Sequence, residues 1–216
     1  MSIPAVPEVR IAILAKAPMP GLAKTRLAPA LGAAGAAALA ERLLRHAAAQ
    51  AAAAAPGRVT LWAAPDATHP VFTQLQQQLG LALAVQPAGD LGARMAHVFE
   101  TTFATGDGPV LLMGSDIPAL DSATLRRAAA ALRTQTAVVF VPALDGGYAL
   151  VGLRAPRQGL LAALFDGMTW STPQVMDQTR QRLAALRVPH TELPAMADID
   201  EPADLARLPP GWGDAD

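Results

Sequence analysis

Short apolar segments alternate with longer helical segments through the first 141 residues of this chain, and this alternation constrains the fold more than any other feature. Residues 9–15, for example, are apolar except for Arg10 and precede a proline-rich loop, as expected of a buried parallel strand. We expect strands at residues 9–15, 58–64, 81–86, 110–113, 137–141 and 148–153, with a short seventh near 190–193. We expect helices at residues 31–54, 69–79, 91–104, 121–133 and 173–186.

This order of elements, with short connections, specifies a mostly parallel central sheet with helices on both faces, a three-layer α/β/α fold. The chain has 216 residues, enough for one large domain or at most two small ones. Because no repeat or linker divides it, we expect a single domain over residues 1–216, with its core at about 9–208. The ends before residue 8 and after about 209 are expected to be frayed.

Composition excludes several classes of function. The net charge is −1 and no long basic run occurs, so we expect no nucleic-acid partner. The absence of cysteine excludes disulfides and thiolate metal sites. Residues 33–55 are rich in alanine, but charged side chains interrupt them, which predicts a soluble helix and no membrane span. No secretory signal precedes residue 9, so we expect a cytoplasmic protein.

The loop at residues 16–26 is the strongest candidate for binding an anion. It holds both lysines of the chain, Lys16 and Lys24, whereas fifteen arginines are spread elsewhere and within it. Thr25 and Arg26 add a hydroxyl and a third cation, and Gly21 allows close backbone approach. Such a loop, between a strand and the start of a helix, suits a di- or triphosphate. The alternative is a solvated cationic loop without a ligand.

Two acidic segments are candidates for holding a divalent metal. Asp116 follows the expected strand at 110–113, where a carboxylate can face a cation; it could instead cap the next helix. Asp198 and Asp200 would point the same way if their segment is extended. Asp200 lies before Glu201-Pro202 and could also begin a helix.

Three further segments carry unusual polar residues. Asp145-Gly146-Gly147-Tyr148 is either a ligand-binding loop that contains the only tyrosine or an ordinary hairpin turn. Arg94, in the first turn of a helix, is poorly placed for the helix dipole, so an anion or a salt bridge would explain it. Residues 170–173 form either part of an acceptor pocket or a helix cap. Zinc ligands, a hydrolase elbow and a dinucleotide-binding glycine motif are not found in the sequence.

Taken in order, these segments resemble the DUF2064 family, whose members are often labelled glycosyltransferase-like and include a branch linked to arsenosugar biosynthesis. One departure is Val141-Pro142-Ala143, where the family pattern leads us to expect a Gly-Pro pair. The resemblance spans about residues 9–208. It is carried by Lys16-x-Pro18-x-x-Gly21-x-x-Lys24-Thr25-Arg26-Leu27, Gly89-Asp90-Leu91-Gly92-x-Arg94-Met95, Gly114-Ser115-Asp116-x-Pro118, Asp145-Gly146-Gly147-Tyr148 and Asp198-Ile199-Asp200.

The family is similar to the GT-A, or nucleotide-diphospho-sugar transferase, superfamily, which also holds guanylyltransferases. The resemblance implies that fold, a Mg²⁺ or Mn²⁺ ion at Asp116, and phosphate binding by Lys16, Lys24 and Arg26. It favours Asp200 over Asp198 as the second metal ligand. Fold alone does not give function.

Three functions are compatible with these residues. The leading hypothesis is metal-dependent glycosyl transfer from a nucleoside-diphosphate sugar, with Asp116 and Lys24 acting on the diphosphate and Asp145 orienting or deprotonating an acceptor. Gly146, Gly147, Tyr148 and Arg94 would help bind the nucleotide or the acceptor. The alternatives are nucleotidyl transfer, in which an acceptor phosphate attacks an NTP and pyrophosphate leaves, and a non-catalytic nucleotide-binding protein. The partners are then small molecules, and a homodimer is compatible with the sequence.

Overall fold

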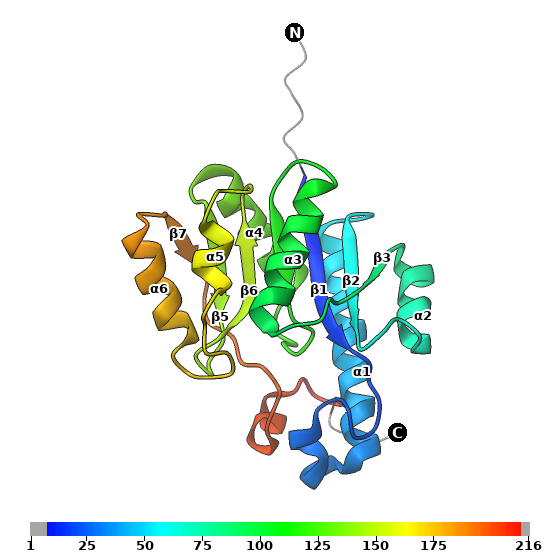
Figure 1. The fold of residues 1–216 in the computed structure, drawn as a ribbon. Coiled ribbons are helices and arrows are strands. Elements are labelled where there is room, and N and C mark those ends of the chain that lie inside the picture. Colours follow the sequence, from blue (N-terminus) through cyan, green and yellow to red (C-terminus); the bar gives the residue numbers. More distant parts are fainter. Residues whose placement is uncertain (1–7, 213–216) are drawn as a thin grey trace.

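The computed structural model describes residues 8–212 and contains one seven-stranded sheet (Figure 1). Its strands lie in the order β3-β2-β1-β4-β6-β5-β7. Only β6 runs antiparallel to its neighbours, so the predicted mostly parallel sheet is confirmed. The strands are β1 (Arg10–Lys16), β2 (Val59–Ala64), β3 (Ala82–Val85), β4 (Val110–Met113), β5 (Val138–Pro142), β6 (Tyr148–Leu153) and β7 (His190–Glu192).

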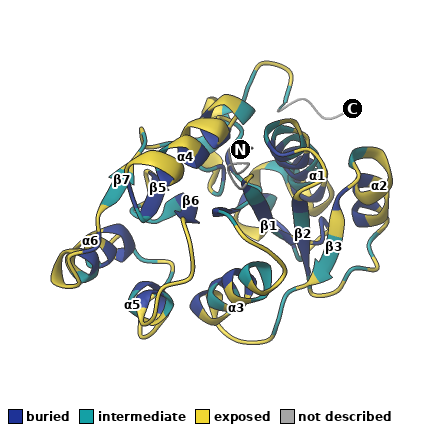
Figure 2. Cartoon of the chain, turned by 90° about the horizontal axis from the view of Figure 1, so that it is seen from above, coloured by how far each residue is buried: buried dark blue, intermediate teal, exposed yellow. Residues whose placement is uncertain are grey.

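Helices cover both faces of the sheet, as the view from above shows (Figure 2). On one face, α1, α2 and α4 pack on a cluster that includes Ile13, Leu61 and Leu111. On the other face, α3, α5 and α6 pack on a cluster that includes Phe99, Phe140 and Val151. The helices are α1 (Ala28–Ala54), α2 (Pro70–Leu79), α3 (Leu91–Ala104), α4 (Ser122–Thr134), α5 (Leu160–Phe165) and α6 (Val175–Ala185), with 3₁₀ turns η1 (Thr25–Leu27) and η2 (Pro202–Arg207).

Helices cover both faces of the sheet, and the strands β4 and β5 are apolar along their whole length. All four residues of β4 and all five residues of β5 are buried, which explains why they read as continuous apolar runs. The bounds of β4, β6 and α3 agree with those expected from the sequence. The sequence missed α5, because this helix has only six residues and begins after Gly159 with no side-chain cap.

The helix α1 is the one described segment that is long and apolar enough to cross a membrane by length and composition, counted over Thr25–Ala54. Its apolar side chains have another partner, since Leu44, Ala48 and Ala51 are buried in the core cluster beneath the sheet. Gly32, with φ 70° and ψ 165°, also interrupts the helical backbone near the start. We therefore interpret α1 as a helix that packs on the core of the α/β fold. The predicted frayed end before residue 8 lies outside the described residues.

Candidate functional site

The functional candidates gather at one edge of the sheet. The loops after β1, β4 and β5 all leave the carboxyl ends of parallel strands, which is where α/β sheets bind ligands. In Figure 1 the loop after β1 and the C-terminal segment after β7 lie side by side below this edge. An ion pair between Lys24 and Asp200 joins these two segments, although 175 residues lie between them in the chain.

Two neighbouring cavities open at this edge. The cationic cavity has about 350 Å³ and is lined by Lys16, Lys24, Thr25 and Arg26, together with Gln86, Asp116 and Asp200. The apolar cavity has about 320 Å³, and its wall includes Met95, Ile117, Tyr148 and Trp170. Both cavities share Leu14, Leu91, Gly114 and Asp116, so Asp116 stands on the boundary between them.

Lys24 links the β1 loop to the acidic residues. Its ammonium group lies 2.9 Å from Asp116 Oδ2 and 3.5 Å from Asp200 Oδ1. The Lys24 side chain is only 5% exposed, whereas those of Asp116 and Asp200 are 46% and 38% exposed. Lys24 also has φ 49°, a left-handed conformation that is uncommon for any residue except glycine and is often found at functional sites. The ion pairs of Lys24 therefore connect the β1 loop to Asp116 and Asp200.

The other cations of the loop behave differently from Lys24. Arg26 lies on the surface, with its guanidinium 2.9 Å from Asp200 Oδ2. Lys16 and Thr25 line the cationic cavity and are exposed. Gly21 has φ 75° and lines neither cavity, so its place in the structure is a turn of the backbone.

Backbone pairing brings the second acidic segment to the site. The segment after β7 continues along β5, where Met196 N–H donates to Pro142 O and Leu144 N–H donates to Met196 O. Farther on, Ile199 N–H donates to Asp116 O. This pairing places Asp198 in the wall of the apolar cavity and Asp200 in the wall of the cationic cavity. A regular extended segment would point both carboxylates the same way, so their different cavities show that residues 198–200, which form no strand, depart from that geometry.

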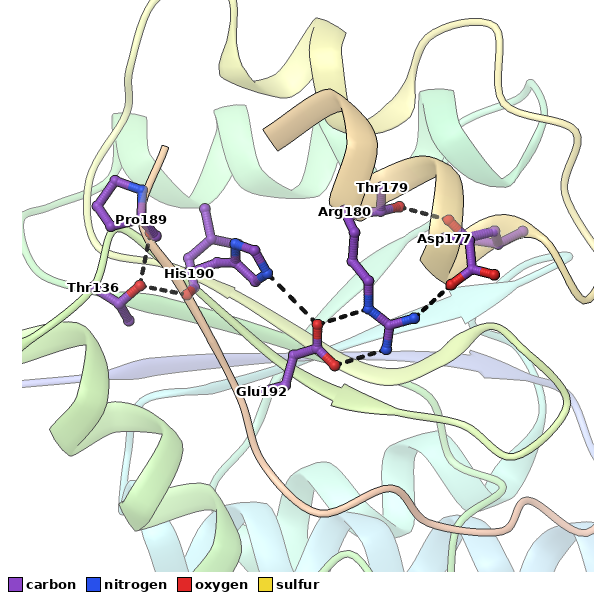
Figure 3. A network of polar contacts seen from close by, with 9 residues as sticks. Thr136, Asp177, Thr179, Arg180, Pro189, His190 and Glu192 are labelled. Carbon is purple, nitrogen blue, oxygen red and sulfur yellow. Dashed lines mark hydrogen bonds and ion pairs between the residues drawn. The ribbon is translucent and has the colours of Figure 1, made fainter. Parts of the chain in front are cut away.

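The strand β7, from which this segment departs, is held to α6 by a network of polar contacts (Figure 3). Arg180 of α6 binds Glu192 of β7 through two hydrogen bonds, at 2.9 and 2.8 Å. Arg180 also donates to Asp177 on its own helix. Hydrogen bonding to Arg180 lowers the pKa of Glu192 despite its partial burial. The pair therefore fixes the strand from which the acidic segment departs.

Asp116 and Asp200 are suitable ligands for a divalent metal. Within residues 8–212 no group of three or more His, Cys, Asp or Glu side chains forms a complete metal cluster. The two carboxylates nevertheless converge on one positive charge, the Lys24 ammonium, and both are partly open to solvent. Mg²⁺ commonly uses one or two carboxylates with phosphate oxygens and waters. The residues present thus fit an ion that a nucleotide would help to coordinate.

The Asp145 segment is a hairpin turn that also lines a cavity. It joins antiparallel β5 and β6, and Asp145 Oδ1 accepts a hydrogen bond of 2.9 Å from Gly147 N–H. Gly146 has φ 92°, and a Cβ there would lie 2.1 Å from the carbonyl oxygen of Pro173. Asp145, Gly147 and Tyr148 line the apolar cavity, but Gly146 does not. The motif is therefore a hairpin turn, and three of its four residues line the apolar cavity.

Burial raises the pKa of two groups at the apolar cavity. For Asp198 burial is the main cause, and the negative charge of Asp145 raises its pKa further. Burial alone raises the pKa of Tyr148 above its usual range. Tyr148 therefore keeps its proton at neutral pH and can donate a hydrogen bond.

Arg94 lines neither cavity but contacts Gln86, a residue of the cationic wall. Its guanidinium donates to Gly89 O at 3.0 Å and to Gln86 Oε1 at 3.4 Å, so partners within the protein explain its position. Gln86, which the sequence analysis missed, lines the cationic cavity and donates to the carbonyls of Ala15 and Trp62. Its only sequence signal is its place at the end of an expected strand.

Comparison with known proteins supports the resemblance found in the sequence. The model of the family described as an uncharacterized protein conserved in bacteria, DUF2064, matches residues 36–172. That range contains the blocks at 89–95, 114–118 and 145–148, whereas the cationic loop and the segment of Asp198 and Asp200 lie outside it. No curated protein sequence gives a match to the chain.

Solved structures extend the likeness over most of the chain. A protein of Desulfovibrio desulfuricans G20, provisionally described as a nucleotide-diphospho-sugar transferase, is 30% identical over 89% of this chain and 82% of its own, with a TM-score of 0.78. A cytidylyltransferase from Leptospira borgpetersenii is 16% identical over 92% and 83% of the two chains, with a TM-score of 0.57. Glucosyl-3-phosphoglycerate synthase from Mycobacterium tuberculosis, solved with Mn²⁺ and UDP, is 11% identical over 93% and 75%, with a TM-score of 0.57. The last two share the fold alone, and the expected GT-A architecture is confirmed.

Proposed function

The chain belongs to the DUF2064 family, and from this membership and the two cavities we propose that it is a nucleotide-using transferase that moves a glycosyl group from a nucleoside-diphosphate sugar to an acceptor hydroxyl. The observation that carries the proposal is the position of Asp116. It stands between a cavity lined by cations and a cavity with no cation in its wall. A transfer reaction needs such a boundary, because donor and acceptor must meet at one point.

The cationic cavity suits the diphosphate of the donor. Lys16, Lys24 and Arg26 bring three positive charges to its wall, and an anion there would gain charge-assisted hydrogen bonds. Asp116 and Asp200 would hold Mg²⁺ or Mn²⁺, which when bound offsets negative charge on the leaving diphosphate. The Lys24 ammonium now lies against both carboxylates, so a metal ion bound there would take its place and leave Lys24 free to pair with the phosphates.

The apolar cavity suits an acceptor without phosphate. Asp116, Asp145 and Asp198 are the charged residues in its wall, and all three are acidic. A phosphorylated acceptor, as nucleotidyl transfer requires, would meet three carboxylates in this wall, and Lys24, at 2.9 Å from Asp116, offsets one of those charges. An acceptor hydroxyl would instead find the Asp145 carboxylate as a hydrogen-bond acceptor or base. This difference favours glycosyl transfer over nucleotidyl transfer.

Binding and product measurements test the proposal together. Thermal shifts are recorded with a panel of NTPs and nucleotide sugars, each with and without Mg²⁺ or Mn²⁺, and the ligand that shifts most is then incubated with candidate acceptors. Metal-dependent stabilisation by a nucleotide sugar and release of nucleoside diphosphate are expected. Selective binding of one NTP with pyrophosphate release would establish nucleotidyl transfer instead. Metal-dependent binding without product from any acceptor would favour a non-catalytic nucleotide-binding protein.

A matched pair of variants tests whether nucleotide binding and its metal dependence rely on Asp116. Asp116→Asn removes a charge at the boundary of the two cavities and is expected to abolish the metal dependence of binding. Asp177→Asn removes a charge on α6, outside both cavity walls, and should leave nucleotide binding unchanged. Equal nucleotide affinities and metal responses in both variants would refute the site.

A further inference from the structure

The apolar side chains in the wall of the apolar cavity also indicate what kind of acceptor would fit it. Leu91, Met95, Met113, Ile117 and Val175 contribute apolar side chains to it. Its volume of about 320 Å³ is at the lower end of the range for small-molecule sites, which are mostly apolar with a few polar groups. A sugar or polyol with hydroxyls on every side would leave many of those hydroxyls without partners against this wall.

Exposed apolar side chains lie beside the cavity as well. Leu91, in the shared wall, is 42% exposed. Leu144 is 61% exposed and stands in the chain between Ala143 and Asp145, both of which line the cavity. Large apolar side chains left in water near a cavity are typical of a surface that a ligand covers. A ligand longer than the cavity could therefore extend over apolar surface.

Two polar groups of the wall lack a hydrogen-bond partner in the described chain, the Tyr148 hydroxyl and the Trp170 indole N–H. The Tyr148 hydroxyl oxygen is buried and makes no hydrogen bond to the rest of the described chain. Tyr148 packs edge-on against Trp170, another residue of the wall, with their ring centroids 6.4 Å apart. A buried hydroxyl normally has a partner, and a hydrogen bond to a ligand oxygen here requires the Tyr148 or Trp170 ring to shift and open the hydroxyl to the cavity.

From these features we propose that the apolar cavity binds an uncharged alcohol with an apolar body as the acceptor, and that it rejects phosphorylated and carboxylated acceptors. This inference rests on the proposed glycosyl transfer. In the transfer step, the alcohol oxygen forms a bond to the anomeric carbon of the donor sugar. The bond from that carbon to the diphosphate oxygen breaks, the nucleoside diphosphate leaves with the electron pair, and the hydroxyl proton passes to Asp145.

Three probes separate the features of the acceptor. The first is 4-phenylbutan-1-ol, the second is its phosphate ester, and the third is glycerol, which has hydroxyls but no apolar body. Binding to the full-length protein is measured by calorimetry and by the fluorescence of Trp170, with a Trp170→Phe variant to assign the signal. We expect the alcohol to bind and the other two to bind at least tenfold more weakly. Equal or tighter binding of the phosphate ester or glycerol, or no binding of the alcohol, would overturn the inference.

A filling variant locates the binding event. Ser171 is exposed and lines only the apolar cavity, so Ser171→Trp should weaken alcohol binding at least tenfold and leave the affinity for a nucleotide sugar unchanged. Arg187→Trp adds tryptophan at an exposed position in neither wall whose φ of 51° is close to the 60° of Ser171, so it has the same backbone cost and should change neither affinity. Unchanged alcohol binding in Ser171→Trp would overturn the assignment to this cavity.

The two proposals fail in distinguishable ways. If nucleotide sugars bind and the alcohol does not, the inference about the acceptor fails while the donor site stands. If the alcohol binds and no nucleotide does, glycosyl transfer fails and the cavity serves another reaction. Turnover then adds a third readout: with donor present, the alcohol should release nucleoside diphosphate at least tenfold faster than glycerol does.

Discussion

Replacing Lys24 with methionine separates the two roles that the geometry gives this side chain. Methionine keeps an unbranched stem of similar length and shares the backbone cost of φ 49°, so Lys24→Met removes the charge alone. The lost ion pairs, at 2.9 and 3.5 Å, involve carboxylates that are 46% and 38% exposed. Solvent screens such pairs, so we expect a loss of about 1–2 kcal/mol in unfolding free energy.

That loss corresponds to a decrease in melting temperature of roughly 2–8 °C for a chain of this length. The nucleotide loses a charge-assisted hydrogen bond, which is worth about 1.5–3 kcal/mol and corresponds to about a 10- to 100-fold weaker affinity. The two carboxylates, freed from the ammonium, should bind Mg²⁺ alone more tightly than in the wild type. Differential scanning fluorimetry and calorimetry with nucleotide and with Mg²⁺ measure the three quantities.

The control is Arg133→Met, which removes one positive charge from an exposed position on α4, outside both cavities. It should leave all three quantities near their wild-type values. Wild-type nucleotide affinity in Lys24→Met would refute the phosphate-binding role. Weaker Mg²⁺ binding in Lys24→Met would refute the argument that Lys24 occupies the position of a cation between the carboxylates.

Three further predictions concern the rest of the site. Asp116→Ala should make nucleotide affinity independent of Mg²⁺ while leaving the protein folded, as titrations with and without the metal will reveal. Gly146→Ala should destabilise the fold by roughly 3 kcal/mol or more in a urea titration, because its φ of 92° is combined with a clash of the added Cβ against a backbone oxygen. The control Gly159→Ala, at φ 74° with open space around it, should cost only about 1–2 kcal/mol in the same titration. Arg180→Ala should lower stability at neutral pH. Because Arg180 lowers the pKa of Glu192, this difference should be full above about pH 5 and should shrink as pH falls below about 4, and a difference that grows toward acid would contradict the pairing.

The site residues differ in how readily the sequence could identify them. Asp116 and the β1 loop follow apolar strands directly, so their position at the carboxyl edge follows from the parallel sheet. Arg94 was a candidate for binding an anion, because the first turn of a helix is an unfavourable place for a cation. The structure gives it Gln86 and a carbonyl oxygen as partners, and such contacts depend on how the loop at 86–90 folds.

By itself, the sequence determined the fold class, most of the strand and helix bounds, and the edge at which the polar residues meet. Hydrophobic periodicity and turn residues act over short distances along the chain, and they are enough to specify these features. Only the tertiary structure decided that the segment of Asp198 and Asp200 lies beside the Asp116 loop, because this depends on hydrogen bonds from Met196 and Ile199 to a remote strand and loop. The division into a cationic and an apolar cavity is likewise tertiary, since each wall combines residues from four or more separate segments.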